Sequence, residues 1–270
     1  MSTASNELLL EGSGLKKSYG AVEALRGVDF AIARSETIAV VGDNGAGKST
    51  LVKILSGAAQ PTSGCIKFKG SAVAFHSTDE PRSLGIETVY QDLGLCNNLT
   101  VAENVYLGRE ITWRLGPFAF LAKQAMRRRS DEVLRDLSIN APRAGTNVAG
   151  LSGGQRQAVA LARARLWERT LVLLDEPTAA LGVQETRKAM DSVRMIQAEG
   201  TSVVLITHNI PMVMEMSHRI VVLRGGRKVG DVPTSEVTAE AIVSLITGAR
   251  DAWIEPRKTK TLSSLEGVKS

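Results

Sequence analysis

The strongest constraint on this chain is one glycine-rich run, Gly42-Asp43-Asn44-Gly45-Ala46-Gly47-Lys48-Ser49-Thr50. It follows an apolar run over 38–41 that predicts a buried strand, and it leads into a helix predicted over 48–55. The glycines let the backbone curl so that successive N–H groups point inward, and the helix N-terminus adds its dipole to that concavity. A strand, loop and helix of this kind can hold the phosphates of a nucleoside triphosphate.

Two side chains of this loop have separate expected roles. Lys48 is expected to reach the β- and γ-phosphates, and the Ser49 hydroxyl to ligate Mg²⁺. The alternative is a glycine turn that binds nothing. A chance match to the pattern in a chain of this size is on the order of one in a hundred, so phosphate binding is favoured.

Two later strands are predicted to end in polar residues that suit the same chemistry. The apolar run 171–174 is followed at once by Asp175 and Glu176. At the carboxyl edge of a parallel sheet, Asp175 would hold Mg²⁺ and Glu176 would polarise the attacking water as a general base. The run 202–206 ends at Thr207-His208, which brings a donor and an acceptor to that edge. The alternative is that these strands simply end in solvated polar residues.

A second glycine-rich stretch, Leu151-Ser152-Gly153-Gly154-Gln155, follows much later in the chain. A single triphosphate loop does not need such a turn for itself. The presence of both stretches suggests that a nucleotide is shared between two chains.

Composition permits this interpretation and excludes few others. With 270 residues, 43% of them hydrophobic, the chain can bury the core of one large α/β domain, with or without a smaller subdomain. No apolar run approaches the roughly 18 to 20 residues that span a bilayer, and the polar start lacks a signal-peptide pattern, so a cytosolic protein is expected. Cys65 and Cys96 are expected to be reduced packing residues, and His76 and His218 to be structural.

The net charge of +5 could indicate a nucleic acid, an anionic membrane surface or no particular partner. The densest basic run, 127–129, is followed by Asp131 and Glu132 and has no interleaved aromatic residues for base stacking. We interpret it as a solvated helix face and expect no nucleic-acid partner.

Apolar patterning divides the chain into successive regions. Residues 8–70 are predicted to be rich in strands, and 92–148 to be helical and amphipathic around a loop at 114–117. From 151 onward, strands and helices alternate, which favours a mostly parallel sheet covered by helices. The polar segment 255–270 is expected to be a mobile end.

Taken together, the motifs resemble the ATP-hydrolysing subunits of ABC transporters over about 8–248. The phosphate loop looks like their Walker A motif, 171–176 looks like Walker B, and 151–155 is identical to their signature LSGGQ. The resemblance implies that Gln91 links Mg²⁺ and the attacking water to the helical region. It also implies that His208 contacts the γ-phosphate and that Tyr19 stacks on adenine.

The resemblance implies an α/β fold of the P-loop NTPase kind, with a mostly parallel central sheet, an antiparallel β subdomain and an inserted α-helical subdomain. We expect an ABC ATPase domain over 6–254, with its catalytic core in 6–91 and 151–254, its helical subdomain in 92–150, and the mobile tail in 255–270. ATP and Mg²⁺ are the implied cofactors. The expected catalytic residues are Lys48, Gln91, Glu176 and His208. The expected metal ligands are Ser49, Gln91 and Asp175. The expected nucleotide contacts are Tyr19, residues 42–50, Ser152, Gly153, Gly154 and Gln155.

In such ATPases the signature turn would donate to the γ-phosphate of ATP held by the partner chain's phosphate loop. This chain has one copy of each motif, so the resemblance implies a homodimer with two ATP molecules sandwiched head to tail. One position departs from the family pattern, because Gly182 replaces a usual aspartate. A more mobile loop or slower hydrolysis is expected there, in an enzyme that remains active.

A narrower resemblance, to monosaccharide importers of the ribose, xylose and fructose type, rests on the segments 90–104, 107–110 and 242–248. It implies a multi-spanning membrane permease as partner, a periplasmic sugar-binding protein as an indirect one, and a place at the cytoplasmic face of the inner membrane. A groove lined by residues near 91–109 would receive a short helix of the permease. Trp113, Phe118 and Phe120 could contribute to it, although buried packing is the favoured role.

Two rival functions stay open at this point. A soluble ABC ATPase that acts on nucleic acid or ribosomes would usually carry two cassettes or a long coiled-coil insertion, and neither is seen in this sequence. A non-hydrolysing regulatory module is the other rival, to which Gly182 could point.

Overall fold

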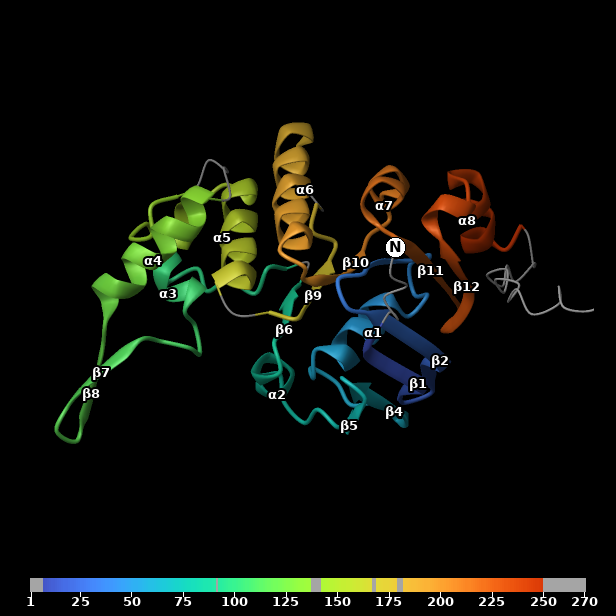
Figure 1. The fold of residues 1–270 in the computed structure, drawn as a ribbon, viewed down its shortest axis with the longest axis horizontal. Helices are drawn as coiled ribbons and strands as arrows, with labels where there is room; N and C mark the ends of the chain where they lie inside the picture. Colours follow the sequence, from blue (N-terminus) through green and yellow to red (C-terminus); the bar gives the residue numbers. More distant parts are fainter. Residues whose placement is uncertain (1–6, 91, 137–141, 167–168, 179–181, 250–270) are drawn as a thin grey trace, which may run out of the picture.

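In the computed structural model, which describes residues 7–90, 92–136, 142–166, 169–178 and 182–249, six strands form the central sheet in the order β12-β11-β3-β10-β9-β6 (Figure 1). The five from β11 to β6 run parallel, and β12 is antiparallel to β11. The strands are β3 Thr37–Val41, β6 Ile86–Val89, β9 Leu171–Asp175, β10 Ser202–Ile206, β11 Arg219–Arg224 and β12 Arg227–Pro233. The prediction of a mostly parallel central sheet is confirmed.

A second, antiparallel sheet has the order β2-β1-β4-β5. It packs with the first helix of the chain, because side chains of β1, β2 and β4 share one buried cluster with Leu51, Ile54 and Leu55 of that helix. The predicted antiparallel β subdomain is therefore present. Its elements are β1 Leu8–Tyr19, β2 Val22–Ala33, β4 Ser63–Phe68, β5 Ser71–Val73 and the helix α1 Lys48–Leu55.

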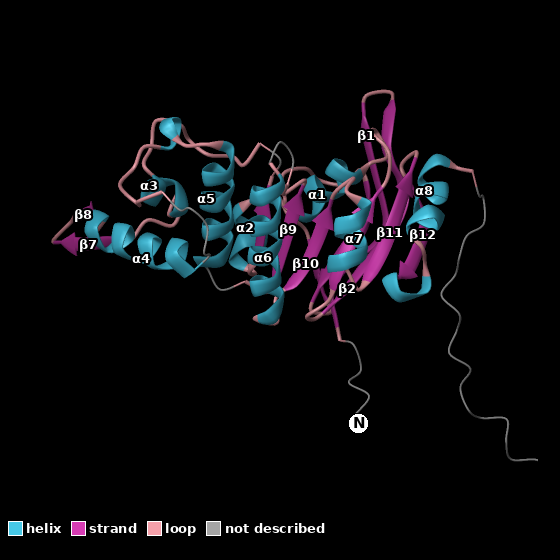
Figure 2. Ribbon diagram, turned by 90° about the horizontal axis from the view of Figure 1, so that it is seen from above, coloured by secondary structure: helices cyan, strands magenta, loops and turns pink. Residues whose placement is uncertain are grey.

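The face of the central sheet opposite α1 is covered by helices (Figures 1 and 2). β3 shows how the two faces are filled, since successive side chains of a strand point to opposite sides. Ile38 and Val40 pack in the cluster that holds α1, whereas Ala39 and Val41 pack with residues of α7 and α8. The remaining elements outside the helical region are α2 Asp79–Ser83, α6 Val183–Ala198, α7 Ile210–Met216, the short η2 Thr234–Glu236 and α8 Ala239–Thr247.

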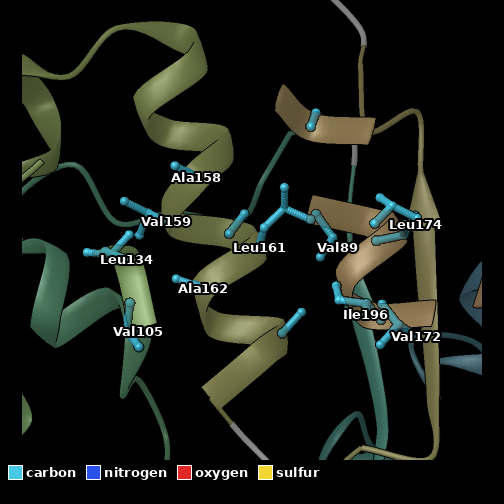
Figure 3. Close-up of a cluster of buried hydrophobic side chains, with 14 of the residues drawn as sticks. Val89, Val105, Leu134, Ala158, Val159, Leu161, Ala162, Val172, Leu174 and Ile196 are labelled. Atoms are coloured by element: carbon cyan, nitrogen blue, oxygen red, sulfur yellow. The ribbon is translucent and has the colours of Figure 1, made fainter. Parts of the chain in front are cut away.

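The helical region is joined to the sheet by α5, Gly153–Leu166. Small residues of α5, such as Ala158 and Ala162, are fully buried and let neighbouring helices approach closely. The α5 side chains lie between two groups, Val105 and Leu134 on one side and Val89, Val172, Leu174 and Ile196 on the other (Figure 3). The other elements here are α3 Val101–Val105, α4 Lys123–Asp136 and the short η1 Val148–Gly150.

One stretch of the predicted helical region is a β-hairpin instead. β7 Thr112–Leu115 pairs with β8 Phe118–Leu121 across a turn at Gly116-Pro117. The reason is local: in β7, Trp113 and Leu115 alternate with Thr112 and Arg114, and a short apolar run over 118–121 follows a turn at Gly116, whose φ is 61°. The helical prediction is wrong here, and so is buried packing for Trp113, Phe118 and Phe120, which are 51%, 67% and 44% exposed.

Five smaller expectations can also be compared with the structure. Cys65 is exposed, so its prediction as a packing residue is wrong, whereas Cys96 is half-buried. His218 accepts a hydrogen bond from the Thr37 N–H at 2.9 Å, which is the structural role predicted for it. His76 is exposed and lies 3.6 Å from Glu80. Within the described ranges, no helix is both long and apolar enough to cross a membrane.

Candidate nucleotide site

The glycine-rich loop between β3 and α1 has a shape that only glycine permits at two positions. Gly42 has φ of 152°, and a Cβ atom there would lie 2.2 Å from the carbonyl oxygen of Leu223. Gly47 has φ of 104°, and its Cβ would lie 2.7 Å from the carbonyl oxygen of Ala24. The backbone of the loop therefore lies directly against β11 and β2, in a conformation closed to other residues.

The loop lines an open cavity of about 290 Å³. The Lys48 ammonium donates to the carbonyl oxygens of Gly42 at 2.7 Å and Asp43 at 3.0 Å, so it lies at the loop itself. Tyr19 is 48% exposed at the end of β1 and pairs with Val22, which lines the cavity. The lining residues are Val22, Glu23, Ala24, Asn44, Gly45, Ala46, Gly47, Lys48, Ser49 and Thr50.

Asp175 ends β9 with its side chain largely buried. Burial raises the pKa of this carboxyl above its ordinary value, and the negative charge of Glu176 raises it further, whereas Lys48 and Lys53 lower it. A divalent cation beside Asp175 would offset both the burial and the repulsion. No cluster of three or more His, Cys, Asp or Glu able to hold a metal occurs in the described part of the chain. A single buried carboxylate beside a phosphate-binding loop fits a cation that takes most of its ligands from phosphate and water, as Mg²⁺ does.

Glu176 and His208 contact each other directly. In the β9–β10 pair, Asp175 is opposite Ile206, so the next residues of both strands emerge at the same edge. The Glu176 N–H donates to the carbonyl oxygen of Ile206 at 2.8 Å, and Glu176 Oε1 lies 3.0 Å from His208 Nδ1. The other carboxylate oxygen, Oε2, is buried and has no hydrogen-bond partner among the described residues. A buried carboxylate oxygen left free in this way can accept a proton from a bound water.

The backbone of Glu176 is strained. Its φ is 51°, in the left-handed region, which costs a non-glycine residue on the order of 1–3 kcal/mol. Strain of this kind persists where surrounding structure holds it, and the bond to Ile206 is one such restraint. With its backbone held in this conformation, Glu176 directs its side chain toward His208, at the end of the neighbouring strand.

The signature turn is separate from the phosphate loop of the same chain. It lies at the start of α5, on the helical side of the sheet, and none of its residues lines the cavity at the loop (Figure 1). Within the turn, the Ser152 N–H donates to Gln155 Oε1 at 3.0 Å, and the Gln155 N–H donates to Ser152 Oγ at 3.3 Å. This reciprocal pair caps the helix and leaves the N–H groups of Gly153 and Gly154 at its open end.

Gln91 lies outside the described residues, but the segment that follows it is held by α5. Arg163 donates from its two terminal nitrogens to the carbonyl oxygens of Leu93 and Gly94, each at 3.3 Å. Arg156, just past the signature turn, donates to Asn97 Oδ1 at 3.0 Å. The sequence interpretation missed both arginines. Their signal was weak, since an arginine on a helix usually faces solvent.

Arg109 marks a second contact that the sequence interpretation missed. Its guanidinium lies 2.7 Å from the carboxylate of Glu87, which is 5% exposed on β6. Burial raises the pKa of Glu87, and the nearby Arg109 lowers it. Arg109 also donates to the carbonyl oxygen of Arg82 at 3.1 Å, so it joins the segment after α3 to β6 and α2.

Gly182 begins α6 as an exposed residue with extended backbone and no side-chain cap. An aspartate at such a position would accept a hydrogen bond from the first turn of the helix. Residues 179–181, which precede it, lie outside the described residues.

Proteins with similar sequences identify the family to which this arrangement of residues belongs. A family model described as ABC transporter matches residues 25–179, more than half of the chain. The xylose/arabinose import ATP-binding protein of Sulfolobus acidocaldarius is 45% identical over 88% of this chain and 94% of its own length. The fructose import ATP-binding protein of Rhizobium meliloti is 41% identical over 91% of this chain and 96% of its own length. A ribose import ATP-binding protein of Rubrobacter xylanophilus is 42% identical over 89% of this chain but 47% of its own length.

Solved structures agree with the sequence relatives. A dimeric bacterial ABC transporter cassette matches with a TM-score of 0.73 and 27% identity, over 84% of this chain and 99% of that one. A structure of a cassette dimer in a post-hydrolysis state with ADP and Pi matches with a TM-score of 0.72 and the same identity and coverage. The loop, the two carboxylates, the histidine and the signature turn thus lie on the fold of a nucleotide-binding cassette, and the chain belongs to the ABC transporter family.

Proposed function

We propose that this chain is the ATP-hydrolysing subunit of a transporter that imports a simple sugar. The observation that carries the proposal is the contact of Glu176 with His208 at the sheet edge that also presents Asp175 and the phosphate loop. The sugar is inferred from the relatives, among which proteins of xylose/arabinose and fructose import match over nearly their whole length.

The chemistry proposed for the site divides between its residues. Backbone N–H groups of 44–50 and the Lys48 ammonium bind the phosphates, and Tyr19 stacks on the base. Ser49, Asp175 and Gln91 would hold Mg²⁺, which neutralises charge on the β- and γ-phosphates when bound. Glu176 Oε2 takes a proton from the attacking water, while His208 holds Oε1 and so fixes the direction of the carboxylate.

The site is proposed to be completed by a second copy of the chain. The N–H groups of Gly153 and Gly154 at the open start of α5 suit a γ-phosphate, but the turn does not line its own chain's cavity. Across a two-fold axis, the turn of each chain would close the loop of the other. Hydrolysis would remove the shared contact and let the dimer reopen.

A multi-spanning permease is the proposed partner, and it would hold this chain at the cytoplasmic face of the inner membrane. A periplasmic sugar-binding protein would act through the permease. The permease would dock beside the segment that follows Gln91. Arg163 fixes that segment to α5, so a displacement there would reach the signature turn through one helix.

The test has two parts. Purified protein should release phosphate from ATP, and Lys48→Ala should lower the rate to background; equal rates for both would refute hydrolysis. A strain lacking this gene should lose uptake of one labelled sugar among ribose, xylose, arabinose and fructose, and wild type but not Lys48→Ala should restore it. Normal uptake of all four sugars would refute the proposed cargo class while leaving the ATPase assignment intact.

A further inference from the structure

The β7–β8 hairpin has one apolar face that nothing in the described chain covers. Trp113 pairs with Phe120 and Leu115 with Phe118, and residues two apart on a strand share a face, so these four side chains lie together. They are 44–67% exposed. The rings of Trp113 and Phe120 stack with centroids 5.0 Å apart, and Phe118 lies 6.5 Å from Phe120. An isolated two-stranded hairpin is marginal in water, so this face needs a partner.

The hairpin projects at the end of the molecule farthest from α8, beyond α4 (Figures 1 and 2). It is thus remote from the phosphate loop and from the strands of both sheets. A surface of three aromatic rings and a leucine at such a tip is well placed to meet a large flat partner.

The charges around the apolar face are positive. The hairpin strands carry Arg114 and no carboxylate, and the first turns of α4 add exposed Lys123, Arg127 and Arg128. Two of these have acidic neighbours, since Lys123 lies 3.5 Å from Glu103 and Arg128 lies 3.5 Å from Glu132. Arg114 projects from the face of the hairpin opposite the rings, and exposed Glu110 precedes β7. With Arg127 and Arg129 exposed on α4, the net charge of the hairpin and the start of α4 remains positive.

This combination selects one kind of partner. Cytoplasmic loops of membrane proteins carry an excess of Lys and Arg, so a basic rim complements a permease loop poorly. A second copy of the same face would bring like charges together across a two-fold axis. An anionic lipid surface complements both parts, because tryptophan prefers the interface, apolar rings insert shallowly, and cations bind the headgroups.

We propose that the β7–β8 hairpin binds the surface of an anionic lipid bilayer, with Trp113, Leu115, Phe118 and Phe120 inserted at the headgroup level and Arg114 among the headgroups. The contact would hold the helical region at the membrane independently of a permease. It goes beyond the proposed function and does not depend on it.

Flotation of the purified full chain with vesicles tests the proposal. The chain should float with vesicles of phosphatidylglycerol and phosphatidylcholine, and much less with phosphatidylcholine alone. The triple variant Trp113→Ala, Phe118→Ala, Phe120→Ala should lower the partition coefficient on the order of tenfold or more. Arg114→Gln should lower it about fivefold. Trp113→Phe, which keeps an apolar ring, should stay close to wild type.

Matched controls separate this contact from other causes. Val243→Ala removes an exposed apolar side chain on α8 and should leave flotation unchanged. Each variant should keep the circular dichroism spectrum and the basal ATPase rate of the wild type. The basic residues of 255–270 are present in every variant, so equal flotation of wild type and triple variant would overturn the proposal. Absence of wild-type flotation with anionic vesicles would overturn it too, without bearing on ATP hydrolysis.

Discussion

Apolar side chains are buried at the phosphate-loop edge of the sheet and exposed on the β7–β8 hairpin. Every residue of β3, β9 and β10 is buried, and the polar groups that follow them meet at one edge. Every residue of β7 and β8 is exposed, although these strands are also rich in apolar and aromatic side chains. The apolar side chains of the first region are covered by the chain's own core, whereas those of the second have no cover within the described chain. Stability and catalysis should therefore depend on the first region, and attachment to a membrane surface on the second.

The largest effect is expected at the sheet edge. Glu176→Gln should lower ATP turnover by about 10²–10⁴, because the amide cannot take a proton from the attacking water. Nucleotide affinity should change little, since the loop is intact. Phosphate release and equilibrium binding of a labelled nucleotide give the two values. A matched change in the hairpin, Phe118→Ala, should leave turnover unaltered, and a large loss there would break the contrast between the regions.

The same truncation should have different consequences for stability in the two regions. Leu161 is fully buried on α5, so Leu161→Ala should lower the free energy of unfolding by about 2–5 kcal/mol. Phe118 is 67% exposed, so Phe118→Ala should change it by less than about 0.5 kcal/mol. Urea denaturation followed by circular dichroism measures both. Comparable losses would mean that the hairpin packs against the chain itself.

Two glycines of the phosphate loop allow the cost of a steric clash to be separated from the cost of a left-handed backbone. Gly42→Ala should cost about 3 kcal/mol, because the new Cβ meets the Leu223 carbonyl in a conformation that disfavours side chains. Gly45 also has positive φ, but nothing lies within 4 Å of its would-be Cβ, so Gly45→Ala should cost only about 1 kcal/mol. Thermal unfolding of the two variants should rank them in this order, and the reverse order would contradict the loop geometry.

The smallest effect is expected at Gly182. Gly182→Asp should stabilise α6 by a few tenths of a kcal/mol, because the carboxylate can cap the first turn. If this glycine also slows hydrolysis, the variant should raise the ATPase rate, and Gly182→Ala should not. A rate unchanged by both substitutions would show that the departure from the family pattern is neutral.

The sequence predicts a structural feature well when neighbouring residues or a general rule of folding determine that feature. The glycine-rich loop is specified by neighbouring residues, and its strand, loop and helix were predicted with correct bounds for α1. The position of Glu176 and His208 at one sheet edge was predicted less directly, from the rule that parallel strands end at one edge, and their direct contact was not predicted. Both depend on patterns that are local or general.

The arginine contacts and the exposure of the hairpin's aromatic rings depend on neither kind of pattern. Whether Arg163 faces solvent or the backbone of Leu93 is decided by how α5 packs, which its own sequence does not state. The alternation in β7 is a local signal for a strand. The rings were nevertheless predicted to be buried, because large apolar side chains usually are, and their own sequence does not show that the described chain leaves them exposed. Sequence patterns indicate that a side chain avoids water, and they do not indicate which partner covers it.

A complete nucleotide site is proposed to need two chains, because the phosphate loop of one chain requires the signature turn of another. Sedimentation of Glu176→Gln with and without ATP and Mg²⁺ measures whether the two chains associate. The variant should have the mass of a dimer with ATP and of a monomer without it, and adding Ser152→Arg should keep it monomeric with ATP. A Glu176→Gln chain that binds ATP but remains a monomer would contradict the claim.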